Sequence, residues 1–281
     1  MSATLIGTSH GTDDPAGQAA VRALLDGVRA ARPGLDVREA FVDVQRPEVG
    51  DVLAKAVRDA GVPGASDGAG VVGVAGDAGV PGVVGQDGVP AGGGAVSGPG
   101  AVVVPLLLST GYHVRHDIAQ AVAAVNEVAD GAAVAAEPLG PHPLLVDILA
   151  DRYAAAEATH GPFRSDDAVV LAAAGSSVAA AATAVEEVAS ALAQRLGRPV
   201  TPAYGAGAEP RVPAAVASAR SAAARVIVVS YLLAPGYFLD RVLEAGADVV
   251  TDPVAGPPGA DKADPRLVQV VLDRYDAALG S

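Results

Sequence analysis

Two histidines in the first half of the chain could carry chemistry. His10 lies in the segment Leu5-Ile-Gly-Thr-Ser-His-Gly-Thr12, and His113 ends the segment Val102-Val-Val-Pro-Leu-Leu-Leu-Ser-Thr-Gly-Tyr-His113. Neutral imidazoles bind borderline divalent metals and accept protons near neutral pH. The pair therefore predicts a site for metal binding or proton transfer. The alternative is two unrelated loop histidines that are hydrogen-bonded to the backbone.

A carboxylate could join the two histidines. Asp43 follows Phe41 and Val42 near the end of a predicted strand over residues 37–44. Sets of two histidines and one carboxylate favour redox-capable divalent metals. Asp43 is thus a candidate third ligand or proton acceptor, or alternatively an ordinary aspartate that caps a turn.

Strand-like and helix-like segments alternate along the chain, and this pattern is what must position the histidines. Apolar runs at residues 4–7, 37–44 and 102–108 predict strands, and apolar residues at helical spacing follow each of them. Such alternation predicts a parallel α/β sheet, in which ligands bind at the carboxyl ends of the strands. If the first and third strands are neighbours, His10 and His113 face one crevice.

The second half of the chain repeats the order of the first. Four segments match in the same order, at residues 170–177, 204–212, 226–238 and 267–275. In this match Gly175 stands where His10 would be, and Phe238 stands where His113 would be. We therefore predict two similar doubly wound domains, residues 1–160 and 161–281, with a single site in the first.

The repeat also exposes an insertion. The offset between matching residues falls from 165 for His10 and Gly175 to 125 for His113 and Phe238. The extra residues form a Gly-rich segment at about 61–100, in which glycine recurs at every third position from Gly70 to Gly88. This spacing is typical of collagen, but the run is short and holds few prolines. We predict a flexible or polyproline-like surface loop, with a trimerising segment as the alternative.

Composition narrows the classes of function. The chain of 281 residues has 51% hydrophobic and 3% aromatic residues, no cysteine and a formal net charge of −13. The negative charge argues against nucleic acid as a partner. No apolar run reaches the roughly 18 residues that span a bilayer, and no secretory signal opens the sequence, so we expect a cytoplasmic protein without membrane contact. Without cysteine, disulfides and thiolate ligands are excluded.

Three motifs together resemble the sirohydrochlorin chelatases of the class II chelatase superfamily. They are Ser9-His10-Gly11, Phe41-Val-Asp43 with Pro47, and Pro105-Leu-Leu-Leu-Ser-Thr-Gly-Tyr-His-Val114. The likeness covers nearly the whole chain except the Gly-rich insertion. It implies an active-site cleft between two α/β domains, where His10 and His113 bind the divalent metal and help remove the pyrrole protons. The family commonly has Glu in place of Asp43, so this carboxylate reaches one methylene less far.

The resemblance implies that the chain inserts Fe²⁺ or Co²⁺ into sirohydrochlorin, for sirohaem or cobalamin synthesis. Ni²⁺ or Zn²⁺ would be accepted in vitro, and no organic cofactor is implied. We expect substrate contacts from residues beside the histidines: Ser9, Gly11, Ser109, Thr110, Gly111 and Tyr112. Because the substrate carries many carboxylates, we predict a local basic patch from Arg46, Arg115 and Arg241. A fused pair of domains predicts a monomer.

Two other interpretations fit parts of the sequence. A non-catalytic carrier of metal or tetrapyrrole would show the same motifs. The segment around His10 also superficially resembles the strand-His-Gly start of histidine phosphatases, which transfer phosphoryl groups. Those enzymes need an arginine directly before the histidine, whereas Ser9 occupies that place here.

Overall fold

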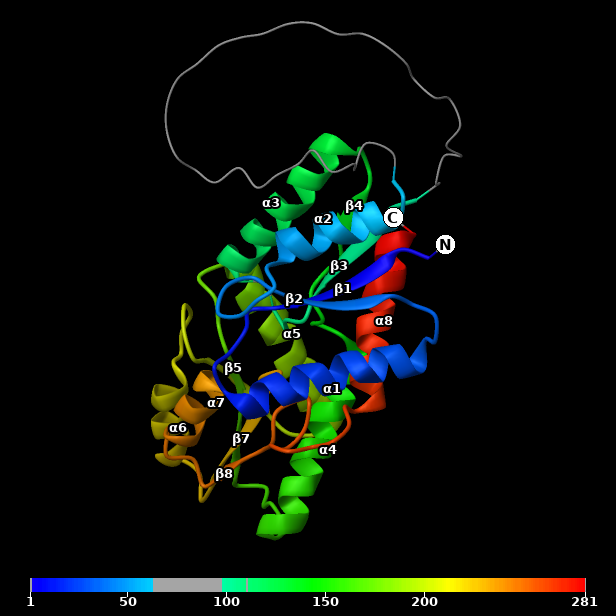
Figure 1. Cartoon of the computed structure of the whole chain (residues 1–281). Helices are drawn as coiled ribbons and strands as arrows, with labels where there is room; N and C mark the ends of the chain where they lie inside the picture. Colours follow the sequence, from blue (N-terminus) through cyan, green and yellow to red (C-terminus); the bar gives the residue numbers. More distant parts are fainter. Residues whose placement is uncertain (1, 63–97, 110, 281) are drawn as a thin grey trace, which may run out of the picture.

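The computed structural model describes residues 2–62, 98–109 and 111–280. Within these ranges the chain forms two parallel four-stranded sheets and eight helices (Figure 1). None of the helices in the described ranges has both the length and the apolar character needed to cross a membrane. The Gly-rich segment predicted at about 61–100 lies almost wholly outside the described residues. The predicted surface loop and its alternative, a trimerising segment, therefore both concern residues that the structure does not describe.

The two halves have the same order of elements. The first half comprises β1 (Thr4–Ser9), α1 (Pro15–Ala31), β2 (Val37–Phe41), α2 (Val49–Asp59), β3 (Ala101–Pro105), α3 (Tyr112–Val128), β4 (Ala133–Ala135) and α4 (Pro143–His160). The second comprises β5 (Ala168–Ala173), α5 (Ala179–Leu196), β6 (Thr201–Tyr204), α6 (Val212–Arg220), β7 (Val226–Tyr231), α7 (Tyr237–Leu243), β8 (Val249–Val250) and α8 (Pro265–Leu279). The strand orders are β2-β1-β3-β4 and β6-β5-β7-β8, which confirms two doubly wound α/β units.

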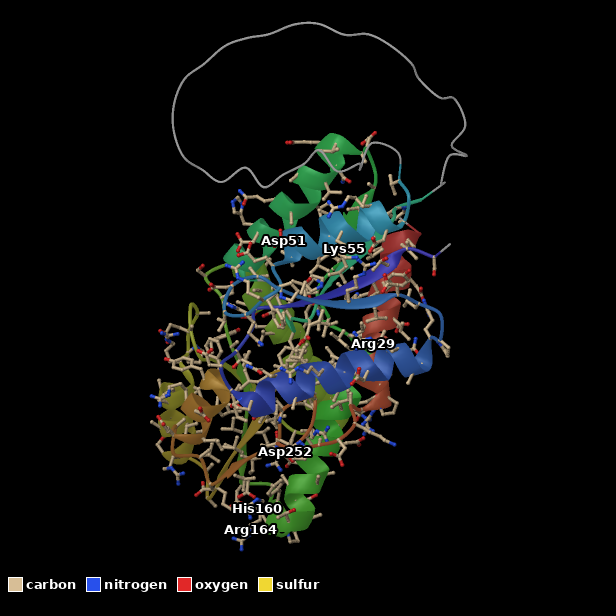
Figure 2. The ribbon with its side chains drawn as sticks, in the orientation of Figure 1. Arg29, Asp51, Lys55, His160, Arg164 and Asp252 are labelled. Carbon is tan, nitrogen blue, oxygen red and sulfur yellow. The ribbon has the colours of Figure 1, made fainter. Side chains whose placement is uncertain are left out.

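Local sequence explains how α1 begins and which face α2 buries. The Asp14 carboxylate accepts a hydrogen bond from the Ala16 N–H at 2.7 Å, and Pro15 occupies the first turn of α1, as expected of a capped helix start. In α2, Val52 and Leu53 are buried, whereas Asp51 and Lys55, labelled in Figure 2, are exposed. The apolar face of α2 thus packs on the sheet, and its charged face is in contact with solvent.

Each sheet is covered on both faces. Leu5 belongs to the large central core, whereas its neighbour Ile6 packs with residues of α2 and α3 on the opposite face. The second sheet repeats this arrangement, with α6 and α7 on its outer face. The central core contains inward-facing residues of both sheets, so the two halves share one apolar interior.

The last helix of each half packs against the other half. α4 contacts α5 and β7, whereas α8, shown in red in Figure 1, contacts α1 and β3. The guanidinium of Arg274 on α8 donates to the Leu139 carbonyl at 3.1 Å, and that of Arg152 on α4 donates to the Val254 carbonyl at 3.3 Å. Because each of these helices packs on the other half, we call α4 and α8 the exchanged helices. The Asp-Arg-Tyr sequence that both contain places one arginine of each helix against a loop of the opposite half.

Backbone hydrogen bonds fix the register of the repeat more finely than the sequence match does. Val42 donates to the Ser9 carbonyl at 3.0 Å, and Gly205 donates to the Ala173 carbonyl at 2.8 Å. Ser9 thus matches Ala173, and His10 matches Ala174. The prediction that Gly175 replaces His10 is wrong by one residue. The prediction rested on sequence similarity, whereas the structural match is defined by the backbone hydrogen bonds between strands. Gly175 instead matches Gly11, and both have positive φ, 84° and 90°.

The second match is confirmed. α3 and α7 begin at Tyr112 and Tyr237, and the residues before them, Gly111 and Gly236, are the N-caps. His113 therefore matches Phe238.

Candidate active site between the two halves

A cleft of about 530 Å³ lies where the carboxyl ends of the two sheets meet. In each sheet the chain leaves the first strand toward one side and the third strand toward the other, which creates the switch point where ligands bind in open α/β sheets. The volume is in the range of small-molecule sites. The described lining comes from both halves: residues 10–12, 44, 106–109 and 111 of the first, and residues 173–177 and 231–238 of the second.

His10 lines this cleft and is exposed. It follows β1 directly, and its carbonyl accepts a hydrogen bond from Val44 at 3.3 Å, which ties it to the loop after β2. Gly11 allows the turn that follows, because its φ is +90° and a Cβ there would lie 3.1 Å from the Gln45 nitrogen. The backbone therefore holds His10 firmly at the edge of the sheet and its imidazole at the cleft.

The strand that leads to His113 lies next to β1, which was the condition for the two histidines to face one crevice. β3 pairs with β1 in parallel, and Leu106 donates to the Thr8 carbonyl at 2.8 Å. His113 is in the first turn of α3, directly after the loop that lines the cleft. Its side chain, like those of Tyr112 and Val114, lies outside the described side chains, as does the whole of Thr110. The pairing of His10 with His113 on a metal stays a prediction.

The third predicted ligand lies on the same edge of the sheet. β2 ends at Phe41, three residues before the predicted end, so Asp43 falls in an exposed bend, while the next residue, Val44, lines the cleft. Among the described residues, no group of three or more His, Asp or Glu side chains is arranged to hold a metal ion. A ligand role for Asp43 stays a prediction.

The predicted substrate contacts divide into three groups. Gly11, Ser109 and Gly111 line the cleft, and Ser9 is buried in β1 outside the lining. The arginines do not belong to the described lining: Arg46 pairs with Glu48, Arg241 pairs with Glu244 at 2.5 Å, and Arg115 is exposed on α3. The described lining contains no Lys, Arg, Asp or Glu at all, so the basic patch remains a prediction for the rim.

Tyr231 joins the two halves at the floor of the cleft. Its side chain is buried, and its hydroxyl donates to the Leu108 carbonyl of the first half at 3.0 Å. Gly140 leaves room for this contact, because a Cβ there would lie 2.0 Å from the Tyr231 hydroxyl. Burial raises the pKa of the Tyr231 phenol well above its usual range, with Arg274 opposing the rise. Tyr231 therefore keeps its proton and holds the loop that leads from β3 to His113.

The halves also touch beside the cleft. Gly17 of α1 lies so close to the loop after β7 that a Cβ there would be 2.6 Å from the Pro235 carbonyl oxygen. A Cβ at Gly236 would in turn lie 3.4 Å from the Thr12 hydroxyl. The start of α1 and the loop that precedes α7 are thus packed backbone to backbone.

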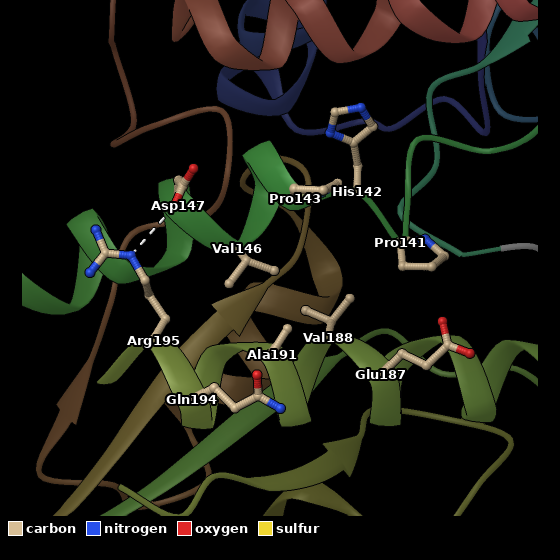
Figure 3. A pocket seen from close by; sticks show the side chains of 10 residues that line it. All are labelled: Pro141, His142, Pro143, Val146, Asp147, Glu187, Val188, Ala191, Gln194 and Arg195. Atoms are coloured by element: carbon tan, nitrogen blue, oxygen red, sulfur yellow. Dashed lines mark hydrogen bonds and ion pairs between the residues drawn. The ribbon is translucent and has the colours of Figure 1, made fainter. Parts of the chain in front are cut away.

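A second cavity, of about 660 Å³, lies between α4 and α5 (Figure 3). His142 is at its edge, where Nδ1 accepts the Leu144 N–H at 3.2 Å and Nε2 lies 3.3 Å from Asp273. Burial and the nearby Arg274 lower the pKa of His142. Asp147 and Arg195 form an exposed ion pair at 3.5 Å across the opening. None of the predicted site residues lines this cavity, and the role shown by His142 is to cap α4.

The cleft contains residues that the sequence does not single out as functional. Tyr231, Tyr237 and Phe238 all line it. A signal was present in the composition, because the chain holds only six Tyr and three Phe and three of these nine lie within eight residues of one another.

The site and fold together define a two-sheet α/β protein with a ligand cleft at facing switch points. The chain belongs to the CbiX family, whose model matches residues 4–63, 96–156 and 168–277. A curated relative, the sirohydrochlorin ferrochelatase of Priestia megaterium, is 31% identical over 153 residues, which cover 53% of this chain and 56% of that enzyme. The match thus spans little more than half of that relative.

Solved structures resemble the whole chain. SirB from Bacillus subtilis with Fe³⁺ is 16% identical, with a TM-score of 0.70 over 99% of this chain and 96% of that one. The sirohydrochlorin chelatase SirB from Bacillus subtilis subspecies spizizenii in complex with cobalt is 16% identical, with a TM-score of 0.68 over 100% and 96%. At this level of identity the likeness establishes the shared fold.

Proposed function

We propose that this chain is a chelatase that inserts a divalent metal, Fe²⁺ or Co²⁺, into sirohydrochlorin. The observation that carries the proposal is the position of His10, at the cleft beside the β3 loop that leads to His113. Membership of the CbiX family, the activity named for the Priestia megaterium relative and the metals named for the two SirB structures support it.

The reaction exchanges one M²⁺ ion for two pyrrole N–H protons, so the site needs a base. Imidazole is the side chain that exchanges protons near neutral pH, and His10 brings one to the described lining of the cleft. Tyr231 does not serve as this base, because burial raises the pKa of its phenol. We assign proton removal to His10 and His113.

The metal is a substrate here and must leave the protein for the macrocycle. Imidazoles bind borderline divalent metals without the strong hold of thiolates, and the chain has no cysteine. His10 and His113 therefore suit a transient hand-over site, and Asp43 is the candidate third ligand. The contacts assigned to Ser9, Gly11, Ser109, Thr110, Gly111 and Tyr112, and the rim arginines Arg46 and Arg115, belong to the same proposal.

We also infer that one chain is sufficient, because residues of both halves already line the cleft. A cytoplasmic location stays a prediction of the sequence.

The test is metal insertion followed by the absorbance change of sirohydrochlorin on mixing with Co²⁺ or Fe²⁺. His10→Ala and His113→Ala should each lower the rate by about 10²–10⁴-fold, the range for loss of a general base. The matched control is His160→Ala, since His160, labelled in Figure 2, is exposed at the end of α4 and is not part of the described cleft lining. Full activity in both cleft variants would contradict the proposal. Stoichiometric binding without metallated product from the wild type would identify a carrier instead.

A further inference from the structure

We propose that Tyr237 and Phe238 form an aromatic wall on the second half, against which the flat face of a tetrapyrrole macrocycle stacks. The identity of this ligand rests on the proposed function. Tyr237 and Phe238 of the second half line the same cleft as His10 of the first half, so a macrocycle bound in that cleft could contact the rings and the imidazole together.

Both rings are unusually exposed for this chain. The exposed fraction is 70% for Tyr237 and 37% for Phe238, whereas Tyr153, Tyr204 and Tyr275 are buried. Apolar surface left open at the mouth of a cleft is a feature of ligand and partner sites. Because both residues belong to the lining of a cleft that is continuous with His10, a ligand in that cleft would cover them.

The rings are held in place before any ligand arrives. A Cβ at Gly205 would lie 2.9 Å from Phe238 Cδ1, so the missing side chain lets the Phe238 ring rest directly on the backbone after β6. Tyr237 packs edge-on against Phe238, with centroids 5.5 Å apart and planes at 76°. α7 itself is anchored by the buried Leu239. Such preorganisation lowers the entropy lost when a ligand binds.

The charges around the wall indicate the class of ligand. The described lining of the cleft is free of Lys, Arg, Asp and Glu, which suits the uncharged interior of a macrocycle. One turn along α7, the Arg241 guanidinium lies over the Tyr237 ring, 5.8 Å from its centre, and is paired with Glu244 at 2.5 Å. An apolar aromatic surface with a cation beside it fits a flat conjugated ring that carries carboxylates on its periphery.

The wall also gives a role to the substitution in the repeat. Phe238 occupies the position that matches His113, so the second half has an aromatic ring for stacking where the first half has an imidazole. We therefore assign the second half to binding and the first half to chemistry.

The experiment measures equilibrium binding of metal-free sirohydrochlorin, without added metal, by absorbance and fluorescence titration. Phe238→Leu keeps an apolar side chain but loses the ring, so Kd should rise about tenfold, and Phe238→Tyr should restore it to within twofold of the wild type. Tyr237→Ala should raise Kd in the same direction. The control is Leu243→Ala, because Leu243 is 56% exposed on the same helix but lies outside the cleft lining.

Steady-state insertion separates binding from chemistry. In Phe238→Leu we expect KM to rise with Kd while kcat stays within about threefold, because such a variant loses mainly binding that is shared by substrate and transition state. A Kd unchanged in Phe238→Leu, or a wild type that does not bind the macrocycle, would overturn the aromatic wall. If the wild type binds and Phe238→Leu weakens binding, yet no metallated product forms, the wall stands and the proposed function fails. If the wild type forms metallated product while Kd is unchanged in Phe238→Leu, the proposed function stands and the aromatic wall fails.

Discussion

At the carboxyl ends of their sheets the two halves have glycines at matching positions but different side chains beside them. Gly11 and Gly175 both take positive φ after the first strand. Gly111 and Gly236 are both the N-cap of the helix after the third strand, although their φ values differ, −78° and 142°. Beside these glycines, Ala174 matches His10 and Phe238 matches His113. The comparison shows that the positions of the glycines are repeated, whereas the residues next to them provide an imidazole in one half and an apolar surface in the other.

The amino ends of the sheets differ in a second way. In the first half, the Tyr275 hydroxyl from α8 donates directly to the Ala3 carbonyl at 2.5 Å. In the second half, Arg198 lies between the corresponding groups, since it donates to Tyr153 at 2.8 Å and to the Asp167 carbonyl. The tyrosine of each exchanged helix is thus linked to the carbonyl that precedes the first strand of the opposite sheet. Tyr275 makes this link directly, whereas Tyr153 makes it through the Arg198 guanidinium.

The largest effect on the contact between the halves is expected from Gly17→Ala. The new Cβ would lie 2.6 Å from the Pro235 carbonyl oxygen, and neither backbone can move without shifting the cleft wall. We expect the free energy of unfolding to fall by about 1–3 kcal/mol and metal insertion to slow with it. Denaturant unfolding and the insertion assay measure both.

The matched control is Gly50→Ala, in α2, where a Cβ would meet nothing within 4 Å. This variant should be unchanged or more stable by up to about 1 kcal/mol, since alanine is the better helix former. Equal stability of Gly17→Ala and the wild type would show that the halves are not in firm contact beside the cleft.

A pair of tyrosine variants separates the carboxyl ends from the amino ends. Tyr231→Phe and Tyr275→Phe each remove one buried hydroxyl that donates to a carbonyl of the first half. Both should lower the free energy of unfolding by about 1 kcal/mol. Only Tyr231→Phe should also slow metal insertion, because Tyr231 holds the loop that leads to His113. Equal insertion rates in the two variants would argue against this positioning role.

The smallest effect is expected at the surface of the exchanged helix α8. Arg32 on the first half donates to both carboxylate oxygens of Asp276 at 2.6 Å, and this bond lowers the pKa of Asp276. A lowered pKa stabilises the fold above the ordinary aspartate pKa of about 3.9, and this stabilisation is lost as pH falls through the lower folded-state value. Asp276→Asn should therefore cost about 0.2–1 kcal/mol at pH 7, and the difference from the wild type should disappear in acid.

Asp147→Asn is the comparison for this pair. Asp147 on α4 lies 3.5 Å from Arg195, in an exposed pair with longer geometry, so its loss should be smaller still. Urea unfolding at pH 7 and at low pH tests both variants. A pH-independent difference for Asp276→Asn would mean that its effect is not electrostatic.

Much of the fold could be predicted from the sequence, because the alternation of strands and helices can be read from apolar residues and the twofold repeat can be read from four matching segments. The position of His10 after β1 follows from the same pattern, whereas the pairing of β3 with β1 was only a condition in the sequence analysis and is shown by the structure. The exchange of α4 and α8 could not be predicted. The pattern of apolar residues in an amphipathic helix indicates that one face is buried, but it does not indicate which sheet that face packs on.

The site shows a similar limit. The one-residue shift from Gly175 to Ala174 depends on hydrogen bonds that similarity of letters does not contain. Phe238 appeared in the repeat only as the loss of a histidine, whereas its exposure and its contact with Gly205 show what replaced that histidine.

The exchanged helices have a consequence for damage to the gene. A stop codon or a protease cut shortly before Pro265 would spare every residue proposed to bind the metal. It would nonetheless remove α8, and with it the cover of β3 and the hydroxyl that holds the carbonyl before β1. The fifteen residues of α8 are therefore needed to keep β1, and with it His10, in place, although α8 contributes none of the proposed metal ligands.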